Sequence, residues 1–424
     1  MKETRKTRLH GWHTEKGATM AEFSGYDMPL WYPSGSKREH LSVLTGAGLF
    51  DTSHMSVIIV DGEGAFDLLQ YCFSRDLDHC GKNERKPLAV GKCIYGVFLN
   101  ASGCVIDDAV LYRLGQTSFM VVVNAGMGPE ITRHLEKHRN GLDAVITDQT
   151  GKIAKIDIQG PSSARILFNL LVGPETIFQA FSYFSFKGHF DSASPLSGEA
   201  RVLDDVPILL SRSGYTGEFG FEMFIESDGL YALWESVLEA GDSFDLACCG
   251  LAARDSLRCG AGLPLARKDI GNWPFLNNPW QFALPFKSDR SGFTKKFIGA
   301  DALKKALNTP YTYPFVGFDP RKVRLCASPG VIDEHGKTIG TVLTCTTDMG
   351  IGFHDGRVYS IAGPDKPDGF IPKGLSCGFL KVKKRIERGK VVEIDDGRRR
   401  IKVMVTADIR PDRTAHRPIN EMIQ

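Results

Sequence analysis

Two adjacent aspartates, Asp107 and Asp108, stand near the start of an otherwise apolar run that continues to Leu111. The run has the composition of a β-strand, in which successive side chains point to opposite faces. One carboxylate must therefore face inward, toward a core or a pocket, and burying it is costly unless a partner or a ligand compensates. This pattern makes the pair a candidate for acid–base or electrostatic chemistry.

Three other segments carry polar groups at suggestive spacing, residues 48–55, 213–222 and 250–258. Taken singly, each has an ordinary structural explanation: a capped turn, a hairpin turn, and ion pairs on a helix surface. Glu222 sits in an apolar strand, where alternation places it opposite Phe221 and Met223, so on this evidence alone it can simply point to solvent. The segments indicate a particular function only when they are considered together.

The composition is that of a soluble globular protein of two or three domains. The chain has 424 residues, 42% hydrophobic and 24% charged, with a net charge of +2, which gives no reason to expect nucleic acid or an anionic membrane as a partner. We find no apolar run of the roughly 20 residues that a membrane span needs and no signal peptide. The ten cysteines form no C-x-x-C motif, so we expect a reducing, cytoplasmic location.

Neither a metal site nor a nucleotide site is predicted. His134 and His138 have i, i+4 spacing, but two histidines alone complete no zinc site, and their surroundings are typical of a solvated helix face. G-x-G-x-x-G and Walker A motifs are absent from the sequence, which argues against nicotinamide, flavin and nucleoside-triphosphate enzymes.

The elements that must position the aspartates can be read from the pattern. Strands are expected at 57–60, 105–112 and 119–123, the last two joined by a hairpin loop, and Pro129 opens a helix that runs to about His138. From about Pro310, short strands alternate with turns to the end, which predicts a separate β-rich domain. Within it, residues 353–373 are expected to form a long exposed loop or a hairpin.

In this order and at these separations, the segments closely resemble the T-protein (aminomethyltransferase) of the glycine cleavage system and its wider folate-dependent family. The matching motifs fall at residues 25–30, 39–43, 47–55, 99–103, 105–108, 159–161, 214–218, 252–258, 297–299 and 339–340. The resemblance covers most of the chain. It implies an α+β, three-lobed fold around a central folate channel, with residues 1–300 forming a folate-binding region of two intertwined α+β lobes and residues 310–424 a β-barrel-like C-terminal domain.

The resemblance also implies the reaction and its residues. Aminomethyl-loaded lipoyl carrier (H) protein and tetrahydrofolate would give 5,10-methylenetetrahydrofolate and ammonia, with Asp108 as the catalytic residue facing the folate and Asp107 in a structural role on the opposite face. The other folate contacts map onto Met55, Tyr95, Val110, Asn124, Tyr215, Glu222 and Arg254.

The expected roles of these contacts follow from their side-chain chemistry. A carboxylate such as Glu222 accepts two pterin N–H donors at once, and the guanidinium of Arg254 can fix that carboxylate or another polar group. Met55, Tyr95 and Tyr215 can pack on the flat rings of the folate.

The chain departs from the family pattern at four places. Cys104 stands where a second glycine is usual, and residues 265–269, 279–284 and 343–348 differ from the usual motifs. These departures leave two alternatives open. One is a relative that moves a methyl group from a small methylated donor onto tetrahydrofolate. The other is a non-catalytic folate-binding protein, although the Lys-Gly-Cys-Tyr-x-Gly-Gln-Glu signature of such relatives is absent.

Overall fold

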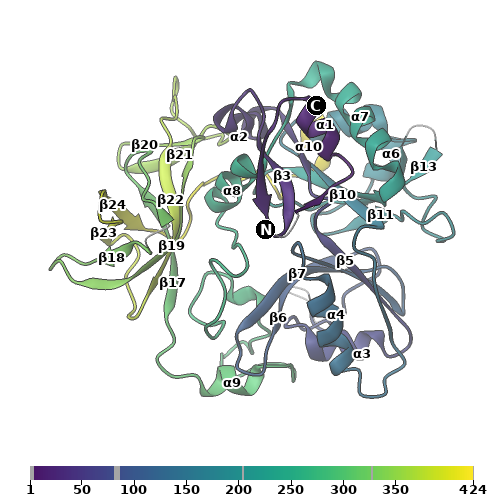
Figure 1. The fold of residues 1–424 in the computed structure, drawn as a ribbon, viewed down its shortest axis with the longest axis horizontal. Helices are drawn as coiled ribbons and strands as arrows, with labels where there is room; N and C mark the ends of the chain where they lie inside the picture. Colours follow the sequence, from purple (N-terminus) through teal and green to yellow (C-terminus); the bar gives the residue numbers. More distant parts are fainter. Residues whose placement is uncertain (1–3, 81–85, 203–204, 326–327, 424) are drawn as a thin grey trace.

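The chain folds into two α+β lobes and a closed β-barrel, which stands at the left of Figure 1. The computed structural model describes residues 4–80, 86–202, 205–325 and 328–423. The resulting α+β architecture with its barrel is the one that the sequence predicted.

The first lobe is built on a five-stranded sheet whose neighbouring strands are all antiparallel. In spatial order its strands are β6 (Cys93–Leu99), β7 (Val105–Arg113), β8 (Ser118–Val123), β5 (Ser56–Asp61) and β9 (Val145–Asp148). Two helices, α3 (Ala65–Cys72) and α4 (Gly128–Lys137), pack their apolar side chains into the same buried core as this sheet. The predicted strands and the helix after Pro129 are therefore confirmed.

The second lobe is built on a six-stranded sheet in which only one strand pair is parallel. In spatial order its strands are β11 (Phe186–Gly188), β14 (Leu209–Ser211), β15 (Gly220–Glu226), β10 (Ile153–Gln159), β4 (Ala47–Asp51) and β16 (Leu246–Cys248). Every residue of β10 is buried. Polar side chains on this strand must therefore find partners inside the protein.

Helices and 3₁₀ turns complete the second lobe. They are α1 (His10–Glu15), α2 (Ser36–Thr45), α5 (Ser163–Leu170), α6 (Pro174–Phe178), α7 (Leu230–Gly241), α8 (Leu251–Gly260) and the 3₁₀ turns η2 (Ser227–Gly229) and η3 (Asp242–Phe244). Small sheets pair β1 (Arg5–Lys6), β3 (Tyr26–Trp31) and β2 (Thr19–Phe23), and β12 (Arg201–Val202) with β13 (Val206–Pro207). The described residues contain no helix of the length and apolarity that a membrane span requires.

The C-terminal barrel closes through six strands. In spatial order they are β17 (Tyr311–Gly317), β22 (Leu375–Val382), β19 (Thr338–Asp348), β18 (Gly330–Ile332), β23 (Val391–Asp395) and β24 (Arg400–Val405). The turn η4 (Gln281–Ala283) and α9 (Ala300–Lys305) precede it, and β20 (Ile351–His354) and β21 (Arg357–Ser360) pair as a hairpin at the start of the predicted loop. After the barrel, α10 (Ile419–Ile423) returns to the core of the second lobe. The boundaries at 300 and 310 stay predictions.

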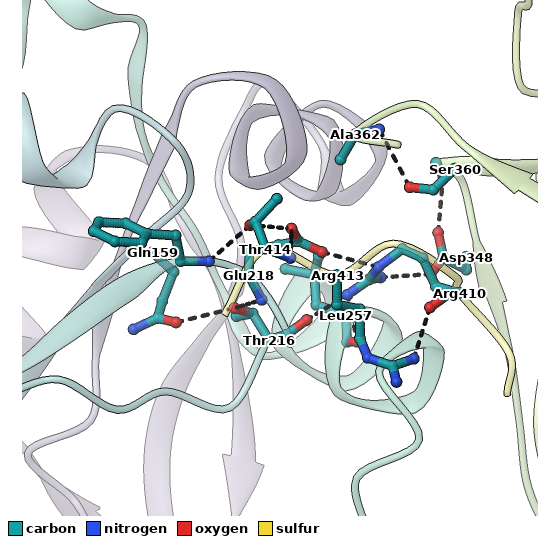
Figure 2. A network of polar contacts seen from close by, with 12 residues as sticks. Gln159, Thr216, Glu218, Leu257, Asp348, Ser360, Ala362, Arg410, Arg413 and Thr414 are labelled. Carbon is teal, nitrogen blue, oxygen red and sulfur yellow. Dashed lines mark hydrogen bonds and ion pairs between the residues drawn. The ribbon is translucent and has the colours of Figure 1, made fainter. Parts of the chain in front are cut away.

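A buried arginine joins the segment after the barrel to the barrel and to the second lobe (Figure 2). Arg410 is fully buried and donates to Asp348 of β19 at 2.6 Å and to Glu218 at 3.1 Å. Thr414 donates to the same Glu218 at 2.6 Å. Burial opposes the charge of Asp348, but the charges of Arg410 and His40 outweigh it and hold the pKa of Asp348 well below its usual range. The second lobe and the barrel therefore share one charged network.

Candidate active site

One cavity of about 1670 Å³ opens where the two lobes meet the barrel. Its lining comes from β7, from α8, from β19 and from residues 407–416. All eight residues that the sequence singled out lie on its wall: Met55, Tyr95, Asp108, Val110, Asn124, Tyr215, Glu222 and Arg254. Residues separated by up to 199 positions in the chain are thus brought to one space, although their individual roles stay predictions.

The two aspartates occupy opposite faces of β7, as the strand alternation predicted. Asp107 is fully buried on the side of the first lobe's core, and Asp108 is half-buried on the cavity side. Asn124, which follows β8, donates its side-chain amide to both, at 2.8 Å to Asp107 and 2.6 Å to Asp108. Its backbone N–H also donates to Asp107 at 2.9 Å. Asp107 thus holds the turn at Asn124 in place, and the side-chain amide of Asn124 orients Asp108.

A tyrosine completes the surroundings of Asp108. The Tyr95 hydroxyl donates to Asp108 Oδ2 at 2.9 Å, and its ring lies 5.9 Å from the ring of Phe282. Burial, followed by the charge of Asp108, raises the pKa of Tyr95 well above its usual range, so the phenol keeps its proton and remains a donor. Asp108 is therefore held by two donors, Tyr95 from β6 and Asn124 from the turn after β8.

Burial raises the pKa of both aspartates. For Asp107 the charge of Asp108 adds to the effect of burial; for Asp108 the hydrogen bonds from Asn124 and Tyr95 oppose it. Two carboxyl groups this close favour sharing a single proton over carrying two charges. The pKa of Asp108, the carboxyl group on the cavity wall, is thus higher than that of an ordinary aspartate, which suits a group that accepts a proton.

A lysine that the sequence prediction missed also lines the cavity. Lys155 on β10 lies 2.5 Å from Glu222 and 2.7 Å from Asp157, and only 3% of it is exposed. Asp157 and Glu222 stand directly across from each other on β10 and β15, an arrangement that would be repulsive without a cation. Lys155 bridges the two carboxylates and offsets one of their two negative charges.

Glu222 faces the cavity and not bulk solvent. It is 7% exposed and accepts hydrogen bonds from Ser213 at 2.5 Å and from Tyr112 at 3.2 Å. The interpretation as a solvent-facing residue is therefore wrong. The strand alternation was right, but the face opposite Phe221 is covered by other parts of the protein.

Arg254 fixes a different carboxylate from Glu222. It donates to Asp157 at 2.7 Å and lies 5.0 Å from the centre of the Tyr215 ring. Burial opposes the charge of Asp157, but Lys155 and Arg254 together lower its pKa. Arg254 and Lys155 thus hold one buried carboxylate from two sides, and Tyr215 packs against the outer cation.

A signal for the missed residues was present in the sequence. In β10, Lys155, Asp157 and Gln159 alternate with isoleucines, so three polar side chains share one face of a strand. His54 is a second missed residue: it is buried, it lines the cavity, and its Nδ1 has no hydrogen-bond partner among the described residues. Burial lowers the pKa of His54 to about 4, so this nitrogen is available to a ligand from a neutral ring.

Two departures from the family pattern have a structural account. Positive φ in the turn after β6 falls on Gly103, at 75°, and Cys104 is not among the positive-φ residues, so a cysteine fits this position without backbone strain. In the segment 279–284, Trp280 is buried and donates to the Gly262 carbonyl at 2.8 Å, and Phe282 is 55% exposed on the cavity wall. This second departure therefore changes the lining of the cavity itself.

Comparisons with known proteins agree on one family. The family model described as the GCVT N-terminal domain matches residues 9–274. An aminomethyltransferase of Streptomyces avermitilis is 34% identical over 346 residues, 80% of this chain and 84% of the relative. One from Staphylococcus epidermidis is 31% identical over 392 residues, 92% and 98% of the two chains. The crystal structure of the glycine cleavage system aminomethyltransferase T from Bartonella henselae superposes with a TM-score of 0.74 at 28% identity, covering 95% of this chain and 96% of that one.

Proposed function

The chain belongs to the GCVT family, and from this premise we propose that it is the tetrahydrofolate-dependent aminomethyltransferase of a glycine cleavage system. Its substrates are then an aminomethyl group on the lipoyl arm of a carrier protein and tetrahydrofolate, and its products 5,10-methylenetetrahydrofolate and ammonia. The position of Asp108 carries this assignment, because a carboxylate with a raised pKa stands on the wall of a large cavity between two fixed donors. The proposal includes a cytoplasmic location, where reduced folate is used.

The residues of the cavity fit a folate. The cavity has a volume of about 1670 Å³, which exceeds the roughly 300–1,000 Å³ common for ligand pockets. This volume leaves room for the reacting end of a second substrate. Met55, Val110 and Tyr215 supply flat or flexible apolar surface, whereas Glu222 supplies acceptor oxygens and His54 an unpartnered ring nitrogen. This mixture of apolar walls and a few polar groups is typical of sites for aromatic heterocycles.

Tetrahydrofolate supplies a nucleophilic ring nitrogen when it is bound, and the protein's own groups manage charge and protons around it. Asp108 in its ionised form stabilises positive charge that develops on nitrogen, and it accepts the proton that is released. Tyr95 and Asn124 hold its two oxygens in place, so little reorganisation is needed during the reaction. General-base assistance of this kind contributes roughly 10²–10⁴-fold in rate.

Replacing Asp108 tests the assignment. Asp108→Asn preserves size and one acceptor oxygen, so tetrahydrofolate affinity should stay within about tenfold, whereas ammonia release from aminomethyl-loaded carrier should fall by about 100-fold or more. Asp228→Asn, at an exposed aspartate of the second lobe, is the matched control. Full turnover by Asp108→Asn contradicts the role of Asp108, and absence of ammonia release by the unmodified protein with competent carrier contradicts the glycine-cleavage assignment.

A specific observation supports a second candidate function, methyl transfer from a small methylated donor to tetrahydrofolate. The segment 279–284 departs from the family pattern and places Trp280 and Phe282 on the cavity wall, with Phe282 close to Tyr95. Aromatic faces beside a carboxylate suit a methylated cation. Incubating the protein with tetrahydrofolate and methylated ammonium or sulfonium compounds, in the absence of carrier, distinguishes the two: 5-methyltetrahydrofolate as the product supports this candidate.

A further inference from the structure

Three potential metal ligands meet where α3 and α4 end in the first lobe. Cys72 is the last residue of α3, and His134 and His138 lie one turn apart at the end of α4. The sulfur of Cys72 and one ring nitrogen from each histidine all lie within 4.8 Å of one another. None of the three lines the large cavity. The histidine pair that the sequence displayed thus gains a third group from a helix about 60 residues earlier in the chain.

Both histidines present a nitrogen that suits ligation. His138 Nδ1 lies 2.7 Å from the backbone carbonyl of His134, and the carbonyl can only accept, so Nδ1 carries the proton and Nε2 keeps its lone pair. This is the arrangement by which metal-binding histidines are commonly oriented. His134 Nε2 is buried and has no hydrogen-bond partner among the described residues. Such an atom is costly unless a ligand satisfies it.

The spacing and the donor set indicate the class of ion. Tetrahedral zinc with one sulfur and two nitrogen ligands needs ligand–ligand distances of about 3.5 Å. The observed separations of up to 4.8 Å exceed this by about 1 Å, which side-chain rotation can close because both histidines are only partly buried. One thiolate and two imidazoles select a borderline transition metal and disfavour Mg²⁺ and Ca²⁺. We propose that Cys72, His134 and His138 bind a Zn²⁺-type ion that joins α3 to α4, with water as the fourth ligand.

The position of the cluster points to a structural role. The α4 helix begins at Gly128, four residues after Asn124, whose side chain holds both Asp107 and Asp108. Joining the far end of α4 to α3 stiffens the support of that turn without placing the ion near the cavity. The ion therefore raises the stability of the first lobe and takes no part in the transfer of the one-carbon group.

Cobalt(II) is the spectroscopic probe for this site. The full-length protein, reduced and stripped of metal, should bind Co²⁺ with a thiolate-to-cobalt charge-transfer band and the visible bands of tetrahedral cobalt, and Zn²⁺ should displace it. Cys72→Ser should abolish the charge-transfer band and weaken binding by 100-fold or more. His138→Gln, at a partly exposed position that tolerates substitution, should weaken binding by at least tenfold and shift the visible bands.

Two matched variants and a second readout complete the test. Cys248→Ser and His335→Gln replace a partly buried cysteine and an exposed histidine elsewhere, and both should leave the cobalt spectrum unchanged. Zn²⁺ should raise the melting temperature of the unmodified protein and of these controls, but not that of His138→Gln. The proposal is overturned if the charge-transfer band survives Cys72→Ser, if His138→Gln leaves the visible bands and the affinity unchanged, or if Co²⁺ binds no tighter than about 100 µM.

Discussion

The substitution Tyr95→Phe isolates the hydrogen bond that holds the ionised form of Asp108. It removes one hydroxyl and keeps the ring that lies beside Phe282. The hydroxyl stays protonated in the folded protein, since burial raises the pKa of Tyr95 well above its usual range. Its loss therefore removes a donor from Asp108 and no charge from the cavity.

The size and direction of the effect follow from this contact. The Tyr95 hydroxyl donates to Asp108 Oδ2 at 2.9 Å, and a hydrogen bond to a charged group contributes about 1.5–3 kcal/mol. Because this bond favours the ionised form, its loss should raise the pKa of Asp108 by about 1–2 units, at about 1.4 kcal/mol per unit. If the ionised form is the active one, the acidic limb of the pH profile moves to higher pH by the same amount.

The assay is kcat/KM for ammonia release from aminomethyl-loaded carrier, measured between about pH 5 and pH 9 with tetrahydrofolate in excess. On the acidic limb, Tyr95→Phe should be slower by roughly 10- to 100-fold, and at high pH its rate should approach that of the unmodified enzyme. A uniform loss across the pH range would mean that the hydroxyl acts through packing or substrate position.

Tyr112→Phe is the matched control, because it removes a hydroxyl that lies 3.2 Å from a different carboxylate, that of Glu222. It should raise KM for tetrahydrofolate and leave the acidic limb where it is. An acidic limb that moves in Tyr112→Phe, or one that stays in place or moves to lower pH in Tyr95→Phe, refutes the reasoning about Asp108.

Three further outcomes are expected. Glu222→Gln should weaken tetrahydrofolate binding about 10- to 100-fold in calorimetry and change kcat little, because a charged acceptor is lost from the cavity wall; unchanged affinity contradicts a contact. Asp348→Asn should lower the free energy of unfolding in urea by about 3–5 kcal/mol, since Arg410 stays buried, whereas Asp319→Asn at an exposed pair should cost under about 1 kcal/mol. Burial opposes the charge of Asp51, but His13 and Ser53 outweigh burial and lower the pKa of Asp51 to about 2. Its stabilisation should be complete above about pH 4 and lost as the pH falls toward 2, so Asp51→Asn should flatten that limb of the urea midpoint against pH.

The sequence determined the local geometry around the aspartates. Period-two alternation in β7 was enough to place Asp107 and Asp108 on opposite faces, because side-chain direction in a strand is a property of the strand itself. The change to short strands after Pro310 likewise indicated a β-rich C-terminal domain, because turn-forming residues separate strands locally. The motif set named eight residues, all of which line the same cavity.

Only the tertiary structure decided which charges meet. The register of β10 against β15 places Asp157 opposite Glu222, and these strands are separated by about 60 residues, so no local pattern reveals that Lys155 must stand between them. The ion pair between Arg254 and Asp157 likewise joins residues that are far apart in the chain. Pairing of buried charges depends on which distant elements pack together, and that is fixed by the shared core of the whole fold rather than by neighbours in the chain. The approach of Cys72 to His134 and His138 likewise depends on how α3 and α4 pack against each other.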